Sequence, residues 1–271
     1  MCKKIKLKAN AKINLFLDIL GKRRDGYHNI KTIFQEVSLY DDINIEEKGK
    51  GIRIICDKPE IPTDNRNLVY KAADLIKRYS NINKGILIKI KKRIPVGAGL
   101  GGGSSDAAAL LKGLNKIWCL KLSKKVIIDI GRKIGADVPF FIEGGKCLAT
   151  GIGDILKPIS LRKKEWYVIV KPCFGISTKY VYSQLTKINK NSKISLYFNR
   201  LEEVVIPVYP EISEIKDKLV SFGASISLMS GSGSCVFGVV NNKNKGKKIR
   251  DLLRKDGYSV WLVHSVNGER F

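Results

Sequence analysis

One segment constrains the architecture of this chain more than any other, the run PVGAGLGGGSSDAAA at residues 95–109. Alternating apolar and basic residues at 85–94 predict a strand before it, and strong helix formers from Ala107 to Leu114 predict a helix after it. Glycines let the backbone approach a ligand closely, and the first N–H groups of a helix lack intrahelical partners. The order strand, glycine loop, helix therefore predicts a phosphate site.

The two commonest phosphate loops do not fit this segment. A Walker loop ends in Gly-Lys-Ser/Thr, whereas this loop ends in Gly103-Ser104-Ser105. Gly97, Gly99 and Gly102 match the dinucleotide pattern G-x-G-x-x-G, but the pattern alone is weakly specific, and no convincing early βαβ unit with a later acidic residue accompanies it. A flexible linker is disfavoured because helix formers follow at once.

Three motifs in order resemble the GHMP kinases, the superfamily of galactokinase and of homoserine, mevalonate and phosphomevalonate kinases. Residues 95–109 resemble the central ATP-binding motif, ANAKINLFL at 9–17 resembles the N-terminal motif, and LMSGSGSCVF at 228–237 resembles the C-terminal glycine motif. The resemblance implies an α+β fold with two domains. It places an ATP-binding domain with a left-handed β-α-β unit at 1–156, a C-terminal α/β domain at 157–271, and the active site in the cleft between them.

Further segments resemble one branch of the superfamily. These are GKRRDGYH at 21–28, TIFQ at 32–35 and GADVPFF at 135–141. The resemblance implies an ATP- and Mg²⁺-dependent kinase that phosphorylates the 2-hydroxyl of a methylerythritol carrying a cytidine diphosphate group, in non-mevalonate isoprenoid biosynthesis. The alternatives are another GHMP kinase, acting on homoserine or phosphomevalonate, a nucleotide-binding regulator without turnover, and a non-catalytic RNA- or ribosome-binding protein.

Two residues are the expected catalytic pair. Asp137 lies in a tight segment after a predicted helix, where a generic aspartate would be a turn residue, and the resemblance makes it the general base. Lys12 is isolated in an apolar run, where it either reaches from a strand end to water or has a partner. The resemblance pairs Lys12 with Asp137, to orient the carboxylate and to stabilise negative charge during phosphoryl transfer.

The resemblance also implies the nucleotide site. The triphosphate is expected over the glycine loop, with Ser104 and Ser105 near its oxygens or Mg²⁺, and Ser105 is the predicted metal ligand because hydroxyls suit a hard cation. Asn67 is expected on the adenine side, with a helix cap as the alternative. The expected ATP-binding residues are Asn67, Pro95, Gly97, Gly99, Gly101, Gly102, Gly103, Ser104 and Ser105.

At the acceptor side, the resemblance assigns His28 to the cytosine edge, with Tyr27 and Tyr182 stacking on the faces of the base. Asn14 lies two residues from Lys12, hence on the same strand face, and either contacts the acceptor or makes a structural hydrogen bond. The glycine-containing loop near 231 is expected to close this side of the cleft, with a simple turn as the alternative. The expected substrate-binding residues are Asn14, Tyr27, His28, Tyr182, Gly231, Ser232 and Gly233.

The charge and hydrophobicity of the chain limit the classes of partner that it can bind. The net charge of +25 would suit a nucleic-acid-binding protein, but the basic residues are spread along the chain and their short clusters lack interleaved aromatics. We therefore expect no specific nucleic acid, and a basic surface would raise the encounter rate with anionic substrates such as the cytidine diphosphate compound that the resemblance implies. No apolar run approaches the roughly 20 residues that span a bilayer. We expect a cytoplasmic protein without a membrane partner, and the six scattered cysteines predict reduced thiols.

Periodicity gives a coarse element order. Helices are predicted at 67–79, capped by Asp64 or Asn65, and at 126–134, 178–185 and 211–222. Extended segments are predicted within 3–20 and at 41–56, 146–155, 166–171, 234–240 and 259–266.

Overall fold

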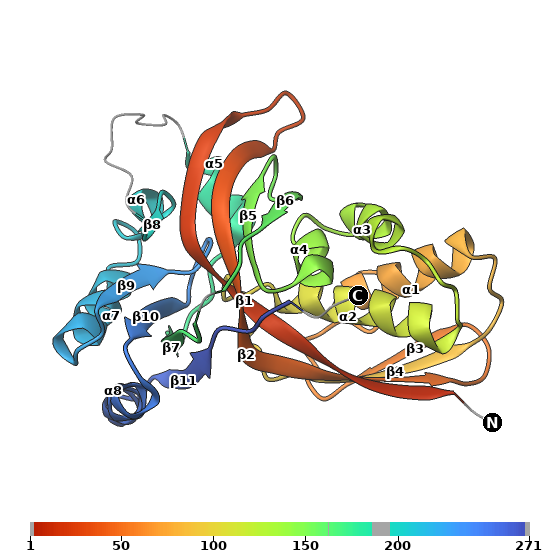
Figure 1. Ribbon diagram of the computed structural model, residues 1–271. Coiled ribbons are helices and arrows are strands. Elements are labelled where there is room, and N and C mark those ends of the chain that lie inside the picture. The colour runs from red at the N-terminus through yellow and green to blue at the C-terminus, as the bar shows by residue number, and fades with distance from the viewer. Residues whose placement is uncertain (1–2, 162, 186–195, 269–271) are drawn as a thin grey trace.

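A long antiparallel pair of strands runs through the middle of the molecule (Figure 1). In the computed structural model, which describes residues 3–161, 163–185 and 196–268, β1 (Lys4–Lys22) pairs along its length with β2 (His28–Glu47). The register shifts after Asn10, Asn14 and Ile19. Such irregularities bend and twist strands, so one pair can serve both parts of the molecule.

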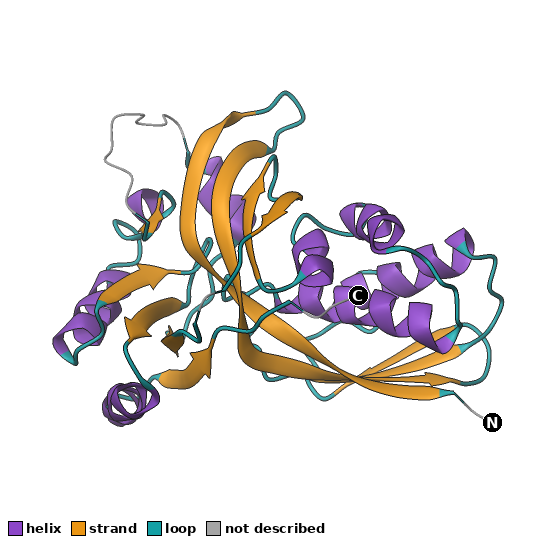
Figure 2. Ribbon diagram, in the orientation of Figure 1, coloured by secondary structure: helices purple, strands orange, loops and turns teal. Residues whose placement is uncertain are grey.

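The first sheet has seven strands and is covered on one face by helices (Figure 2). Its main order is β3-β4-β2-β1-β8, with β5 paired to β2 and β6 paired to β5. Isoleucine side chains of β2 and β4 meet the alanine- and leucine-rich face of α2 in one large core. The elements not yet given are β3 (Ile52–Cys56), α1 (Leu68–Tyr79), β4 (Ile86–Lys91), α2 (Gly102–Ile117), α3 (Lys124–Arg132), α4 (Val138–Glu143), β5 (Lys146–Thr150), β6 (Ile155–Pro158) and β8 (Phe198–Asn199).

The second sheet has four antiparallel strands in the order β11-β7-β10-β9. In β7, Val168 and Val170 join a core with α7 and α8, while Tyr167 and Ile169 join a core with Ala11, Ile13 and Leu15 of β1. Because side chains alternate along a strand, β7 is buried on both faces. The core that contains Tyr167 and Ile169 of β7 together with residues of β1 joins the two sheets. The remaining elements are β7 (Trp166–Lys171), α5 (Thr178–Ser183), α6 (Glu202–Val205), α7 (Glu211–Ser221), β9 (Ile226–Met229), β10 (Val236–Val240), α8 (Lys243–Lys255) and β11 (Ser259–His264).

The predicted elements are present, with differences at their limits. The prediction that Asp64 or Asn65 caps α1 was wrong, because Asn67 caps it and accepts from the Val69 N–H at 2.8 Å. Asp64 instead bonds Arg66. Helix α2 begins at Gly102, inside the glycine run, because Gly101 adopts the left-handed conformation that ends the loop. The predicted stretch 41–56 is divided between β2 and β3 by a turn. Helix α8 was not predicted, because it is strongly basic and buries only a narrow face.

The structure also bears on the expected domain boundary, cysteine state and membrane segments. The predicted domain boundary between 156 and 157 falls within β6 and stays a prediction, while β8 returns from the C-terminal half to pair with β1. Cys56, Cys119, Cys147, Cys173 and Cys235 are free thiols, and Cys2 lies outside the described residues. Among the helices that the structure describes, none combines the length and apolar composition needed to cross a bilayer.

Candidate active site

A cavity of about 1070 Å³ lies where the three motifs meet, between β1, the loop before α2, the segment before α4, helix α5 and the loop after β9. Ser105 and Gly233 are not among its lining residues. The predicted residues that line it are Lys12, Asn14, Tyr27, His28, Asn67, Pro95, Gly97, Gly99, Gly101, Gly102, Gly103, Ser104, Asp137, Tyr182, Gly231 and Ser232.

Lys12 and Asp137 form the charged pair of this cavity. Lys12 Nζ lies 3.7 Å from Asp137 Oδ2 and 5.0 Å from the centre of the Phe34 ring. Burial lowers the pKa of Lys12 below its ordinary value, and the Asp137 carboxylate opposes this shift. Asp137 precedes α4 without a side-chain capping bond, and its side chain is 33% exposed. The carboxylate is therefore held beside a buried cation and remains open to the cavity.

Asn14 fixes the position of Lys12. Lys12 Nζ donates to Asn14 Oδ1 at 2.6 Å, Asn14 Nδ2 donates to Thr32 Oγ1 at 2.8 Å, and Thr32 donates to the Phe16 carbonyl at 2.5 Å. All three side chains are buried. A buried chain of hydrogen bonds in which each member has a partner restricts rotamers, so it orients the ammonium group toward the cavity. Thr32 had no individual assignment from the sequence.

The two glycine loops pack directly on each other. Gly99 has a φ of +73°, and a Cβ there would overlap the carbonyl oxygen of Ser230. Gly231 has a φ of +57°, and a Cβ there would lie 3.2 Å from Asn14 Oδ1 and 3.4 Å from Lys12 Nζ. Gly99 leaves no room for a Cβ, and at Gly231 the positive φ favours glycine while the space for a Cβ is tight. The loops thus bring main chain against the Lys12–Asn14 pair.

The two serines of the phosphate loop have different environments. Ser104 lines the cavity, whereas Ser105 is buried and its hydroxyl donates to the Asn10 carbonyl at 2.6 Å. Ser105 follows Ser104 on α2 by one residue, which turns its side chain to another side of the helix. The geometry therefore favours Ser104 over the predicted Ser105 as a ligand for a metal ion or a phosphate.

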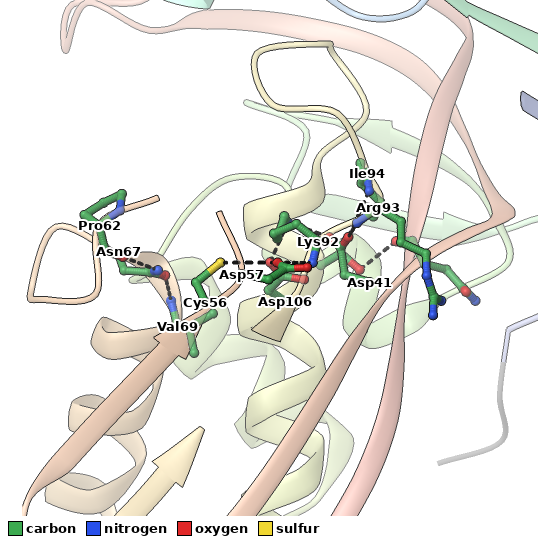
Figure 3. Close-up of polar contacts among 12 residues, drawn as sticks. Asp41, Cys56, Asp57, Pro62, Asn67, Val69, Lys92, Arg93, Ile94 and Asp106 are labelled. Atoms are coloured by element: carbon green, nitrogen blue, oxygen red, sulfur yellow. Dashed lines mark hydrogen bonds and ion pairs between the residues drawn. The ribbon is translucent and has the colours of Figure 1, made fainter. Parts of the chain in front are cut away.

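Asp41, Lys92 and Asp106 form a buried charge cluster beside the start of α2 (Figure 3). The sequence motifs did not predict this cluster. Lys92 Nζ lies 2.5 Å from Asp41 Oδ2 and 2.7 Å from Asp106 Oδ2, and Asp41 Oδ1 also accepts from the N–H groups of Arg93 and Ile94. Burial raises the pKa of Asp106 to about 7; Asp41 adds to the shift and Lys92 opposes it. Lys92 and Asp106 both line the cavity. The cluster joins the strand before the glycine loop to the helix after it.

Asn67 holds the first turn of α1 at another part of the same cavity (Figure 3). Its Oδ1 accepts from the Val69 N–H at 2.8 Å and its Nδ2 donates to the Pro62 carbonyl at 2.6 Å. The capping role, which was the alternative in the sequence, is thus present. A contact with adenine stays a prediction.

The predicted base-reading residues gather at the end of the cavity near the β1–β2 turn. The His28 and Tyr182 rings have centroids 5.4 Å apart at 44°, while Tyr27 is 58% exposed. Burial lowers the pKa of His28, with Lys22 adding to the effect, and burial raises the pKa of Tyr182, with Asp137 adding to that effect. At neutral pH the imidazole is therefore neutral and can both donate and accept. His264 packs edge-on against Trp166, and its backbone N–H donates to Ser38 Oγ at 3.0 Å.

Comparisons with known proteins agree with the three motifs. The family model described as "GHMP kinases N terminal domain" matches residues 67–145, and "GHMP kinases C terminal" matches residues 183–259. The chain is 46% identical to the 4-diphosphocytidyl-2-C-methyl-D-erythritol kinase of Alkaliphilus metalliredigens over 99% of both chains. It is 42% identical to the enzyme of the same name from Acetivibrio thermocellus, over 97% of this chain and 99% of that one.

Solved structures give the same picture. A crystal structure of 4-(cytidine 5'-diphospho)-2C-methyl-D-erythritol kinase matches with a TM-score of 0.85 and 31% identity, over 97% of this chain and 100% of that one. Homoserine kinase from Cytophaga hutchinsonii matches with a TM-score of 0.77 and 19% identity over 99% of this chain and 96% of that one, which shows the shared fold alone. The expected GHMP kinase fold is confirmed. The chain belongs to the GHMP kinases and, within them, to the 4-diphosphocytidyl-2-C-methyl-D-erythritol kinase family.

Proposed function

We propose that this protein transfers the γ-phosphoryl group of ATP to the 2-hydroxyl of 4-diphosphocytidyl-2-C-methyl-D-erythritol, a step of non-mevalonate isoprenoid biosynthesis. The observation that supports this function best is the Lys12–Asp137 pair, which lies in one cavity with the glycine loop and Gly231. Full-length relatives that carry the name of this kinase support the choice of substrate.

Asp137 is the proposed general base. The substrate hydroxyl oxygen forms a bond to the γ-phosphorus of ATP while the bond between the γ-phosphorus and the oxygen that bridges it to the β-phosphate breaks. ADP leaves with that bridging oxygen, and the hydroxyl proton passes to Asp137. Lys12 is buried beside the carboxylate, so its charge acts with little screening by water. We propose that Lys12 orients Asp137 and stabilises the negative charge that develops on the transferred group.

The start of α2 is the proposed phosphate site. Its first N–H groups follow Gly101, whose left-handed conformation turns the chain into the helix. Gly97, Gly99 and Ser104 line the cavity beside it. These groups suit an anion on the basis of both hydrogen bonding and dipole direction.

Mg²⁺ fits a site of this kind. Among the residues that the structure describes, no three His, Cys, Asp or Glu side chains form a metal cluster. Mg²⁺ at nucleotide sites takes most of its ligands from phosphates and water, with one or two protein oxygens. We propose that Ser104 supplies such an oxygen, and that Mg²⁺, when bound, neutralises charge on the phosphate oxygens.

At the acceptor end, we propose that the neutral His28 reads the cytosine edge, and that Tyr27 and Tyr182 contact its faces. Stacking of a base on an aromatic ring is worth roughly 1–3 kcal/mol. Asn14 already bonds Lys12 and Thr32, so its proposed role is to position Lys12. A direct contact of Asn14 with the acceptor, like the cytoplasmic location expected from the sequence, stays a prediction.

The test is an ADP-release assay with ATP, Mg²⁺ and the cytidine diphosphate substrate, run beside homoserine and phosphomevalonate. We expect turnover with the cytidine diphosphate substrate alone. Turnover with homoserine, and none with the cytidine substrate, would contradict the proposal and favour another GHMP kinase activity. No turnover, combined with salt-sensitive RNA binding that survives Asp137→Ala, would favour the RNA-binding alternative.

A further inference from the structure

The short strand β8 connects the two halves of the molecule next to the cavity. Phe198 and Asn199 pair in parallel with Phe16 and Leu17 of β1, and the Arg200 N–H donates to the Leu17 carbonyl at 2.8 Å. Arg200 also donates to Asp18 Oδ1 at 2.9 Å. β8 is thereby attached to the same strand that carries Lys12 and Asn14.

Asn199 extends from this strand to the loop after β9. Its Nδ2 donates to the Met229 carbonyl at 2.8 Å and to the Gly231 carbonyl at 2.7 Å, while its Oδ1 accepts from the Leu201 N–H at 3.0 Å. The residue is buried, with 3% of its surface exposed. Two carbonyl acceptors and one N–H donor fix the orientation of the amide, because a flipped amide would face oxygen with oxygen.

One of the two carbonyls that Asn199 bonds is that of Gly231, which packs on Lys12 and Asn14. A Cβ at Gly231 would lie 3.2 Å from Asn14 Oδ1 and 3.4 Å from Lys12 Nζ, so small movements of this loop change the space above both groups. The Ser230 hydroxyl joins the loop to the Gly99 carbonyl at 3.2 Å, and Ser232 meets Thr178 Oγ1 at 2.7 Å. Asn199 itself does not line the cavity.

We propose that Asn199 is a positioning residue for phosphoryl transfer, which holds the loop 230–233 at a fixed distance from Lys12 and Asn14. The inference rests on the proposed function, because that function gives the loop its place beside the acceptor. A displacement of about 1 Å in such a contact is enough to affect a reaction that depends on orientation. Asn199 therefore affects the acceptor end of the site while touching no reacting atom.

The experiment uses Asn199→Asp, which keeps the shape of the side chain but replaces the NH₂ donor by an oxygen facing two carbonyl oxygens. We expect the KM for the cytidine diphosphate substrate to rise at least about fivefold, as for a buried acceptor left without its donor. We also expect kcat to fall, and the KM for ATP to rise less than the KM for the cytidine substrate, because the loop also contacts Gly99 of the glycine loop. In the protein without ligands, the amide protons of Gly233 and Cys235 should exchange faster, because their bonds to Ser230 and Ala98 depend on the same loop.

Asn115→Asp is the matched control. The Asn115 side chain also braces a loop, through bonds to the N–H and carbonyl of Leu122, but it is not among the cavity lining residues. It should lower the stability without changing either KM. Asn199→Ala is measured in parallel, since a buried carboxylate facing carbonyl oxygens can prevent folding, and it should shift KM and exchange in the same direction.

Unchanged exchange at Gly233 and Cys235 together with an unchanged KM in a folded Asn199 variant would overturn the proposal, as would equal effects of the Asn199 and Asn115 variants on KM. Failure of the wild-type protein to turn over the cytidine substrate would instead contradict the proposed function. In that case, the exchange measurement decides the positioning role by itself.

Discussion

At the scale of single residues, the proposed chemistry depends most on the carboxylate of Asp137. Asparagine has nearly the same shape and can still bond Lys12, but it cannot take the hydroxyl proton. We expect Asp137→Asn to lower kcat by about a hundredfold or more and to leave the KM for ATP nearly unchanged. Steady-state kinetics on folded protein checks this, and activity within a few-fold of wild type would show that Asp137 is not the base.

Tyr27 offers a second test, of substrate recognition. Its side chain is 58% exposed, so Tyr27→Ala should cost little stability. Loss of one stacking partner, at roughly 1–3 kcal/mol, should raise the KM for the cytidine substrate by about fivefold or more, with the KM for ATP unchanged. Tyr79→Ala is a suitable control because Tyr79 is 57% exposed and lies outside the cavity lining. A change confined to the KM for ATP would move Tyr27 to the nucleotide side.

Asp106 predicts a pH dependence of stability. Burial raises its pKa from 3.8 to about 7, next to Lys92 and Asp41, so between about pH 4 and 7 the folded state binds more protons than the unfolded state. The contribution of Asp106 to the free energy of unfolding is therefore fully present below about pH 4 and is lost as the pH rises from there through about 7. Asp106→Asn should remove this slope. Denaturant unfolding from pH 4 to 8 checks it, and parallel pH profiles for wild type and variant would contradict the assignment.

At the scale of elements, predictability followed the strength of the local pattern. The glycine run between a strand and a helix is local, and it predicted α2 and the loop before it, whose phosphate role stays a prediction. The Asp41–Lys92–Asp106 cluster is not local, because it forms only when β2, the end of β4 and α2 pack together. Asn199 likewise has no motif around it, and its contacts with the loop after β9, on which its proposed role rests, form only when β8 pairs with β1.

The glycine loop can be tested with two neighbouring substitutions. Gly97 and Gly99 both have positive φ, at +62° and +73°, but a Cβ at Gly97 meets nothing within 4 Å, whereas one at Gly99 overlaps the Ser230 carbonyl. Gly97→Ala should cost about 1–2 kcal/mol of stability from backbone strain alone. Gly99→Ala should cost roughly 1–3 kcal/mol more, because the two glycine loops must separate. Chemical denaturation measures both, and equal losses would contradict the close packing of the loops.

At the scale of the whole molecule, the core between the two sheets fixes the cavity. Ile13 and Leu15 of β1 pack with Tyr167 and Ile169 of β7, so the strand that carries Lys12 and Asn14 is also part of the contact between the sheets. The resemblance to the GHMP kinases predicted that the site lies between two parts of the fold. It gave no sign that β8 crosses back to the first sheet, because a two-residue strand has too few residues to show a period of two.

The overall charge predicts how the whole molecule responds to salt. With a net charge of +25, the protein should attract anionic substrates over a distance set by the Debye length, which shortens from about 30 Å at 0.01 M salt to about 3 Å at 1 M. We expect kcat/KM for ATP and for the cytidine substrate to fall several-fold across this range. The Lys12–Asp137 pair is partly shielded from solvent, with 6% and 33% of the two side chains exposed, so kcat should change much less. Initial rates in a sodium chloride series at fixed free Mg²⁺ provide the measurement, with thermal melts as the control for folding. Constant kcat/KM would show that the basic residues lie too far from the path of the substrates to guide them, and that the local charges of the cavity alone determine binding.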